Sequence, residues 1–183
     1  MRKLCVSEFV TLDGVMENPQ WTFKFLSDEQ DKYKFDEMKA SDALLLGRVT
    51  YDGFAQAWPN MIEETGEYGE MMNGYAKHVV STTLDEVKWN NSTLIKDNIV
   101  EEISKLKQQP GKDILVFGSC DLVQTLIAND LIDEYRLMVF PIVIGNGKRL
   151  FADKIDEKVF KLVDTKTFSS GVVVLTYQSK ESE

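Results

Sequence analysis

The hydrophobic residues of this chain gather in short runs that polar segments separate. Runs of this length that are rich in Val, Ile, Leu and Phe predict buried β-strands. We expect such strands at residues 3–11, 43–46, 77–81, 93–95, 114–117 and 134–143. Two further apolar segments, 159–168 and 172–178, flank a Ser-Ser-Gly turn and predict a terminal hairpin.

Between the strands in the first half of the chain, the sequence predicts helices. Ser27 followed by Gln30 is a capping-box pattern, and it predicts a helix over 28–40. A short helix is expected over 51–57, with Thr50 as its cap and Trp58-Pro59 as its end. The Gly-rich, acidic residues 60–75 are expected to be partly helical or loose, and 16–25 to form an ordered loop.

Two more helices are expected before the last strands. Asp97 can cap the first, and Pro110-Gly111 stops it. Gly118-Ser119-Cys120 opens the second. Helical spacing places these apolar residues on their inner faces: Ile99, Ile103 and Leu106, and then Leu122, Leu126 and Ile127.

The order of these elements predicts the fold class. Strands alternate with helices as far as residue 128, and then strands follow strands. This order is typical of an α/β sheet that is mostly parallel, with antiparallel strands at one edge. The chain, 1–183, carries no Pro/Ser linker, so we expect one domain with a frayed tail at 179–183.

Composition narrows the classes of protein. The net charge of −9 argues against nucleic acid as the main partner. No apolar run is long enough for a membrane span or a leader, so we expect a cytoplasmic protein. Cys5 and Cys120 lie in apolar stretches, which favours free thiols. His78 is the only histidine, and we expect no metal site.

Candidate chemistry lies where three predicted strands end. Gly47-Arg48-Val49-Thr50 and Gly118-Ser119-Cys120 each follow an apolar strand and open a helix, and Ser81-Thr82-Thr83 ends a third strand. The N-H groups of a helix start suit phosphate, and ligands bind at the carboxyl ends of strands in open α/β sheets. The pattern indicates a ligand with several phosphates, although three ordinary strand-to-helix turns would look the same.

The motifs together resemble a known family. Their order is a Leu-Asp-Gly loop, Leu-Leu-Gly-Arg-Val-Thr-Tyr, Val-Val-Ser-Thr-Thr-Leu, Val-Phe-Gly-Ser, and Pro-Ile-Val-Ile-Gly-Asn-Gly-Lys-Arg-Leu-Phe. This order resembles the dihydrofolate reductase superfamily, in particular the reductase domain of the bifunctional riboflavin-biosynthesis deaminase-reductase. The resemblance implies a three-layer α/β/α domain with a mixed, mostly parallel sheet, a C-terminal antiparallel hairpin, and NADPH as cofactor.

The resemblance also implies roles for particular residues. The cofactor phosphates would be held at the helix start that follows the second strand. Ser81 and Thr82 would lie near the adenosine 2′-phosphate. A further strand-to-helix turn would meet the pyrophosphate through its amides, although the family often has Gly where this chain has Ser119. The cofactor-binding positions are therefore Gly47, Arg48, Thr50, Tyr51, Ser81, Thr82, Gly118, Ser119 and Cys120.

The substrate side rests on an acid of the first helix and on two loop residues. Counting back from Gly47 matches Asp31, with Asp28 close behind, to the helix carboxylate that supports protonation in folate reductases. Asp13 in the Leu-Asp-Gly loop would face the substrate, and Trp21 resembles the loop Trp beside the active site. Each has a plainer interpretation: helix-start acids favour the macrodipole, a turn Asp bonds its own backbone, and a Trp anchors a core.

The implied activity is reduction of a small planar heterocyclic or imine-like compound, as in 5-amino-6-(5-phosphoribosylamino)uracil reductase. Dihydrofolate reduction is a narrower rival, and the riboflavin-pathway reduction by a lone reductase domain is a second. A different class is a non-catalytic NADP-binding or assembly protein that retains the fold. Phe23, Phe25, Phe54 and Trp58 are candidates for a ring-binding pocket or for the core. Exposed strands often pair subunits in the riboflavin branch, so we expect a homodimer.

Overall fold

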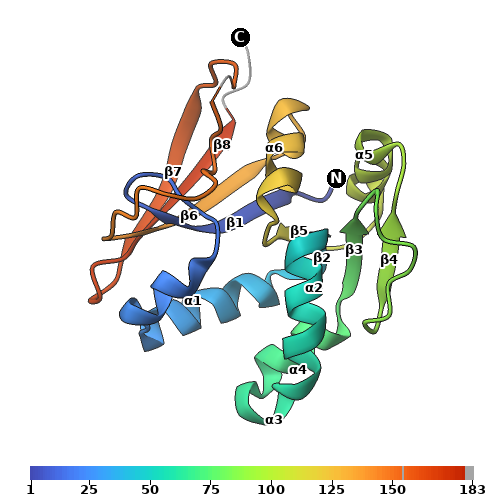
Figure 1. Cartoon of the computed structure of the whole chain (residues 1–183), viewed down its shortest axis with the longest axis horizontal. Helices are drawn as coiled ribbons and strands as arrows, with labels where there is room; N and C mark the ends of the chain where they lie inside the picture. The colour runs from blue at the N-terminus through green and yellow to red at the C-terminus, as the bar shows by residue number, and fades with distance from the viewer. Residues whose placement is uncertain (154, 180–183) are drawn as a thin grey trace.

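A computed structural model describes residues 1–153 and 155–179. Its eight-stranded sheet has the order β4-β3-β2-β5-β1-β6-β8-β7 (Figure 1). The strands are β1 (Leu4–Thr11), β2 (Ser41–Gly47), β3 (Ala76–Val80), β4 (Ser92–Ile95), β5 (Asp113–Val116), β6 (Glu134–Phe140), β7 (Phe160–Thr167) and β8 (Val173–Ser179). The helices are α1 (Asp28–Lys39), α2 (Arg48–Ala57), α3 (Ile62–Thr65), α4 (Glu67–Gly74), α5 (Ile99–Gln108) and α6 (Cys120–Ala128), with 3-10 segments at Pro19–Phe25 and Trp58–Asn60.

The sheet is mixed in the way the sequence predicts. The strands from β4 to β6 pair in parallel, and β8 and β7 add antiparallel strands at one edge. The strand expected over 134–143 ends earlier, at Phe140, because Pro141 has no N-H to donate to a neighbouring strand. Ser179 of the predicted frayed tail ends β8, and 180–183 lie outside the described residues.

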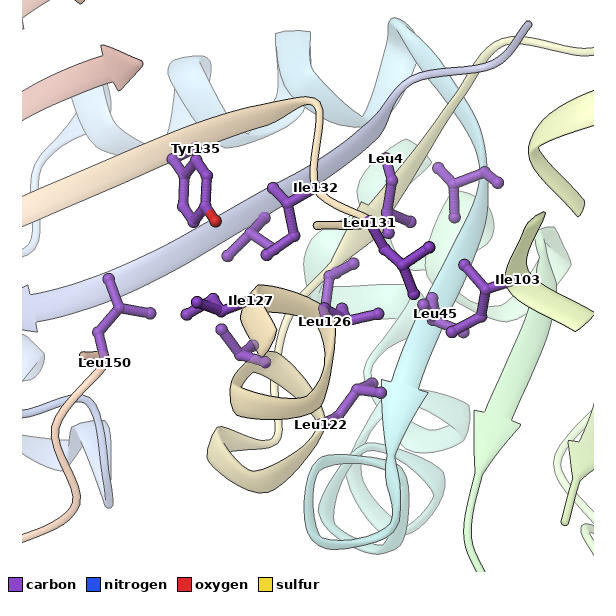
Figure 2. Close-up of a cluster of buried hydrophobic side chains, with 14 of the residues drawn as sticks. Leu4, Leu45, Ile103, Leu122, Leu126, Ile127, Leu131, Ile132, Tyr135 and Leu150 are labelled. Carbon is purple, nitrogen blue, oxygen red and sulfur yellow. The ribbon is translucent and has the colours of Figure 1, made fainter. Parts of the chain in front are cut away.

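Helices cover both faces of the sheet. On one face, Leu44 and Leu46 of β2 pack into a cluster with side chains of α1, α2 and α4. On the other face, Ala43 and Leu45 join side chains of α5 and α6. Figure 2 shows this second cluster, in which the inner face of α6 lies against β1 and β2. The three-layer arrangement is therefore confirmed, and α1 and α6 lie on opposite faces (Figure 1).

The helix starts agree only in part with the expected caps. Ser27 caps α1 as predicted, since its Oγ accepts from the backbone N of Gln30 at 3.3 Å. The Gln30 side chain is instead buried, and its Oε1 has no hydrogen-bond partner among the described residues. Asp97 is not the cap of α5: Asn98 takes that position with a φ of 50°, which Asn tolerates.

The predicted start of α2 is also wrong. The helix begins at Arg48, and Gly47 occupies the N-cap position with extended backbone. Thr50 is therefore inside the first turn, where its hydroxyl faces the turn after β5 instead of capping the helix. Gly47 has a φ of −79° and a ψ of 163°, so the strand continues directly into the helix without a separate capping residue such as Thr50.

Candidate functional site

The sheet has a topological switch point between β5 and β1. The chain leaves β1 through α1 towards β2, and it leaves β5 through α6 towards β6 on the other side of β1. The pairing of β1 with β5 ends at Val6 and Val116, while β1 continues along β6 as far as Thr11. Open α/β sheets bind ligands outside the carboxyl ends of the strands at such a point.

Two strand-to-helix turns meet at this edge. The backbone N of Gly47 donates to the carbonyl oxygen of Gly118 at 2.9 Å. A Cβ on Gly47 would collide with the Ser119 hydroxyl and lie 2.8 Å from the Ser119 nitrogen. A Cβ on Gly118, which has a φ of +97°, would lie 2.7 Å from Oγ1 of Thr50. The structure thus brings together the starts of α2 and α6, and glycine is required for their close approach.

Arg48 and Cys120 flank this meeting point. The Arg48 side chain is about half exposed, and its Nη1 lies 3.1 Å from Oδ2 of Asp52 one turn along α2. The Cys120 thiol donates to the carbonyl oxygen of Arg149 at 3.4 Å. Burial raises the pKa of Cys120, so this group is a neutral thiol at pH 7. Because its ion pair with Asp52 is exposed, the cationic Arg48 can reorient towards an anion without breaking a buried contact.

The residues after β3 are held by their own loop. Ser81 is buried, and its Oγ accepts from the backbone N of Thr83 at 3.2 Å and of Leu84 at 3.0 Å. Thr82 is exposed. The buried Tyr51 hydroxyl accepts from the backbone N of Lys88 and Trp89, which fixes the far end of this loop. The predicted cofactor residues Ser81 and Tyr51 therefore have structural contacts of their own.

Asp13 joins two loops at the carboxyl ends of β1 and β6. Its Oδ1 accepts from the Thr11 hydroxyl at 2.6 Å and from the Ile144 nitrogen at 3.3 Å, and its Oδ2 accepts from the Gly145 nitrogen at 2.8 Å. The Thr11 hydrogen bond, with these two amides, holds the pKa of Asp13 below its usual range. An ionised Asp13 fixes the Leu-Asp-Gly loop to the Gly-Asn-Gly segment.

Trp21 and Asp31 lie in different surroundings. The Trp21 ring meets Phe140 edge-to-face, with ring centroids 5.3 Å apart, and its Nε1 donates to the Glu17 carbonyl. Asp31 is exposed in the first turn of α1. The polar side chains that α1 directs towards the sheet are Gln30, Lys34 and Glu37.

Glu8 was missed in the sequence and is buried at the switch point. The residue is 8% exposed, and its Oε1 has no hydrogen-bond partner among the described residues. That oxygen lies 3.8 Å from the place a Cβ on Gly118 would take. Burial raises the pKa of Glu8 to about 8, against a lowering by Lys34. The available signal was an acid inside a mostly apolar strand, at a position whose neighbours Val6 and Val10 face the core.

Lys34 was also missed. Its Nζ lies 4.3 Å from the ring centroid of Phe117 and 5.5 Å from that of Phe9. It donates to the Ser7 hydroxyl at 2.8 Å and to Glu37. A cation between two aromatic rings is thus fixed on the α1 side of the strand ends, where β1 and β5 separate.

Comparison with known proteins decides the family. A family model described as the RibD C-terminal domain matches residues 2–174. The chain belongs to this family. Over 178 residues it is 38% identical to the uncharacterized protein YyaP of Bacillus subtilis, in an alignment that covers 96% of this chain and 94% of YyaP.

Solved structures support the same fold. A putative riboflavin biosynthesis protein from Shewanella sp. PV-4 has a TM-score of 0.78 at 22% identity, over 99% of this chain and 100% of that one. Dihydrofolate reductase from Enterococcus faecalis, in complex with NADP(H) and RAB-propyl, has a TM-score of 0.65 at 18% identity, over 98% of this chain and 97% of that one. This RibD C-terminal domain therefore has the dihydrofolate reductase-like fold.

Within residues 1–153 and 155–179, no group of three or more His, Cys, Asp or Glu residues is arranged to hold a metal ion. No helix in the described part of the chain has both the length and the apolar surface to cross a membrane. Cys5 and Cys120 are both free thiols, as predicted.

Proposed function

We propose that this protein is an NADPH-dependent reductase of a small planar heterocyclic or imine-like substrate of the pteridine or pyrimidine kind. The observation that carries the proposal is the contact between the turns at Gly47 and Gly118, which joins two helix starts at the switch point. Helix N-termini suit a pyrophosphate, because their backbone N-H groups are free to bind its oxygens. Family membership and the fold support the same conclusion.

The residues present fit such a dinucleotide. Amides of the first turns of α2 and α6, from Arg48 and from Ser119 and Cys120, would bind the pyrophosphate, and the Arg48 guanidinium would bind a phosphate. Ser81 and Thr82 would lie near the adenosine 2′-phosphate. NADPH would supply the hydride; the chain positions the two reactants and excludes water between them.

The substrate would lie on the α1 side of the strand ends. Phe9 and Phe117 offer aromatic surfaces there, and Lys34 lies between them. Trp21 would flank this position from its loop. Asp13 or Asp31 would assist the transfer of a proton to the substrate. Where the carboxylate is ionised, an ordered water bound to it would donate the proton.

A fluorescence titration tests the proposal. Purified protein is titrated with NADPH and with NADH, and the quenching of Trp21, Trp58 and Trp89 is recorded. We expect saturable binding with a Kd on the order of micromolar and a preference for NADPH. Absence of saturable binding to either dinucleotide would contradict the proposal and favour a non-catalytic assembly protein that retains the fold.

Turnover assays separate the remaining alternatives. NADPH oxidation is followed with a panel of pteridine and pyrimidine substrates, including dihydrofolate and the riboflavin-pathway aminouracil. Binding of NADPH without turnover of any substrate would favour a non-catalytic NADP-binding protein. With a substrate in hand, Asp13→Asn and Asp31→Asn are expected to lower kcat with little change in NADPH binding; full turnover by both variants would remove these two residues from the mechanism.

We also propose a homodimer. Strand β7 is an edge strand with an exposed surface, which offers unpaired backbone groups for pairing with a second chain. Light scattering at micromolar protein concentration is expected to give the mass of two chains. A mass of one chain would reject the dimer and leave the reductase proposal untouched.

A further inference from the structure

A buried carboxyl group without a partner lies beside the proposed dinucleotide site. Glu8 shares its face of β1 with Val6 and Val10, on the α6 side of the sheet. The pairing of β1 with β5 ends at Val6, whereas its pairing with β6 continues to Thr11. Glu8 therefore has no paired strand beside it where β5 would continue. Its Oε1 is directed to the Gly118 turn, where the Thr50 hydroxyl also points. Buried polar atoms are normally hydrogen-bonded, so an unpartnered one at a ligand edge calls for an explanation.

The groups around Glu8 do not supply that partner. On the α1 side of the sheet, Lys34 lowers and Glu37 raises the pKa of Glu8. Both side chains form hydrogen bonds with Ser7 and with each other. From α6, Cys120 is near enough for Glu8 to influence its pKa, and the thiol donates to a backbone carbonyl. No hydrogen bond to the carboxyl group is found within the described ranges.

We propose that Glu8 is a dinucleotide-binding residue, whose protonated carboxyl group donates a hydrogen bond to the ligand held between the Gly47 and Gly118 turns. This inference rests on the proposed function, since it takes the ligand to be NADPH. A carboxylate at this position would repel the pyrophosphate and would lack the proton to donate. A carboxylic acid removes the repulsion and adds a donor to the set of backbone N-H groups.

The protonation state has a consequence for binding. Burial raises the pKa of Glu8 to about 8, so the group is mostly the neutral acid at pH 7 and mostly ionised at pH 9. If only the neutral form binds well, the apparent Kd rises as the pH passes through 8. Binding in turn favours the proton, so the pKa of Glu8 must rise further in the complex.

The experiment measures the Kd for NADPH at pH 7, 8 and 9 in the intact chain. Wild type is expected to bind about tenfold more weakly at pH 9 than at pH 7. Glu8→Gln keeps a donor and cannot ionise, so its Kd is expected to stay near the wild-type pH 7 value throughout. Glu8→Met, which has no donor, should bind more weakly at all three values. The matched control is Glu70→Gln on the exposed surface of α4, which should keep the wild-type pH dependence.

The outcomes separate this inference from the proposed function. Saturable NADPH binding that does not change with pH in wild type, or a pH dependence that survives in Glu8→Gln, overturns the role of Glu8 alone. No saturable binding at pH 7 overturns the proposed function as well.

Wild-type protein provides a second test if the variants fail to fold. Carbon-13 NMR of protein labelled at the glutamate carboxyl groups should show one resonance titrating near pH 8 that moves to higher pH with saturating NADPH. A Glu8 pKa that falls or stays constant on binding overturns the inference.

Discussion

Ser7 and Glu8 are neighbours on β1, yet the Ser7 side chain is hydrogen-bonded and an oxygen of the Glu8 side chain has no partner among the described residues. The Ser7 side chain faces α1, where its hydroxyl donates to Oε2 of Glu37 at 2.9 Å and accepts from Lys34. Oε1 of Glu37 lies 3.4 Å from Nη1 of Arg136, which also binds carboxylates of β6 and β5. On this face of the strand, each of the named charges has an opposite charge as its partner.

The other face has the reverse character. Glu8 is as buried as Ser7, but its Oε1 has no partner among the described residues and lies 3.8 Å from the place a Cβ on Gly118 would take. An unpaired buried polar group costs stability, so a fold that keeps one has a use for it elsewhere. The difference supports the proposal that the Glu8 side receives the dinucleotide, whereas the paired charges around Ser7 on the α1 side stabilise the fold.

Arg136→Met tests the stabilising side with the largest expected effect. The substitution leaves Glu37, Glu134 and Asp113 buried or half-buried without their shared cation, and we expect the free energy of unfolding to fall by about 3–5 kcal/mol. Urea denaturation of the variant and of wild type measures this loss of unfolding free energy. Lys105→Ala is the control, since Lys105 also binds two carboxylates but lies on the exposed surface of α5. Equal losses in the two variants would contradict a special role for the buried network.

Gly47→Ala tests the ligand side. The added Cβ collides with the Ser119 hydroxyl and comes within 2.8 Å of the Ser119 nitrogen, so the two turns must separate. We expect NADPH binding to weaken about a hundredfold and unfolding free energy to fall by about 1–3 kcal/mol. Gly53→Ala in the same helix meets no atom within 4 Å and should stabilise the protein slightly without changing binding. Unchanged NADPH affinity in Gly47→Ala would show that the turns do not form the site.

Much of this architecture follows from local patterns that a single sequence contains. The buried strands and the inner face of α6 depend on the spacing of apolar residues, so they were predicted closely. The turns at Gly47 and Gly118 were found because a glycine between an apolar strand and a helix is a local signal. Even there the start of α2 was misplaced, because Thr50 has the side chain of a typical cap, whereas the helix begins directly after the strand, at Arg48.

The buried polar residues could not be found in this way. Whether Glu8 is free or paired depends on where β5 ends relative to β1, which is a property of the sheet. Counting from Gly47 selected Asp31, which is exposed, while the polar residues on the inward face of α1 are Gln30, Lys34 and Glu37. The rotation of α1 that decides this comes from the packing of its Met38 against Leu44 and Leu46 of β2, which is a tertiary contact.

Ser7→Ala gives the smallest of the expected effects and compares the two faces directly. Removing the hydroxyl takes one partner from Lys34 and one from Glu37, but leaves them paired with each other at 2.6 Å. We therefore expect a loss of about 1–2 kcal/mol in unfolding free energy and no change in NADPH affinity. Ser104→Ala on the exposed side of α5, whose hydroxyl bonds a carbonyl of its own helix, should change neither quantity. If Ser7→Ala instead weakens NADPH binding while leaving stability intact, the division of β1 into a stabilising face and a ligand face is wrong.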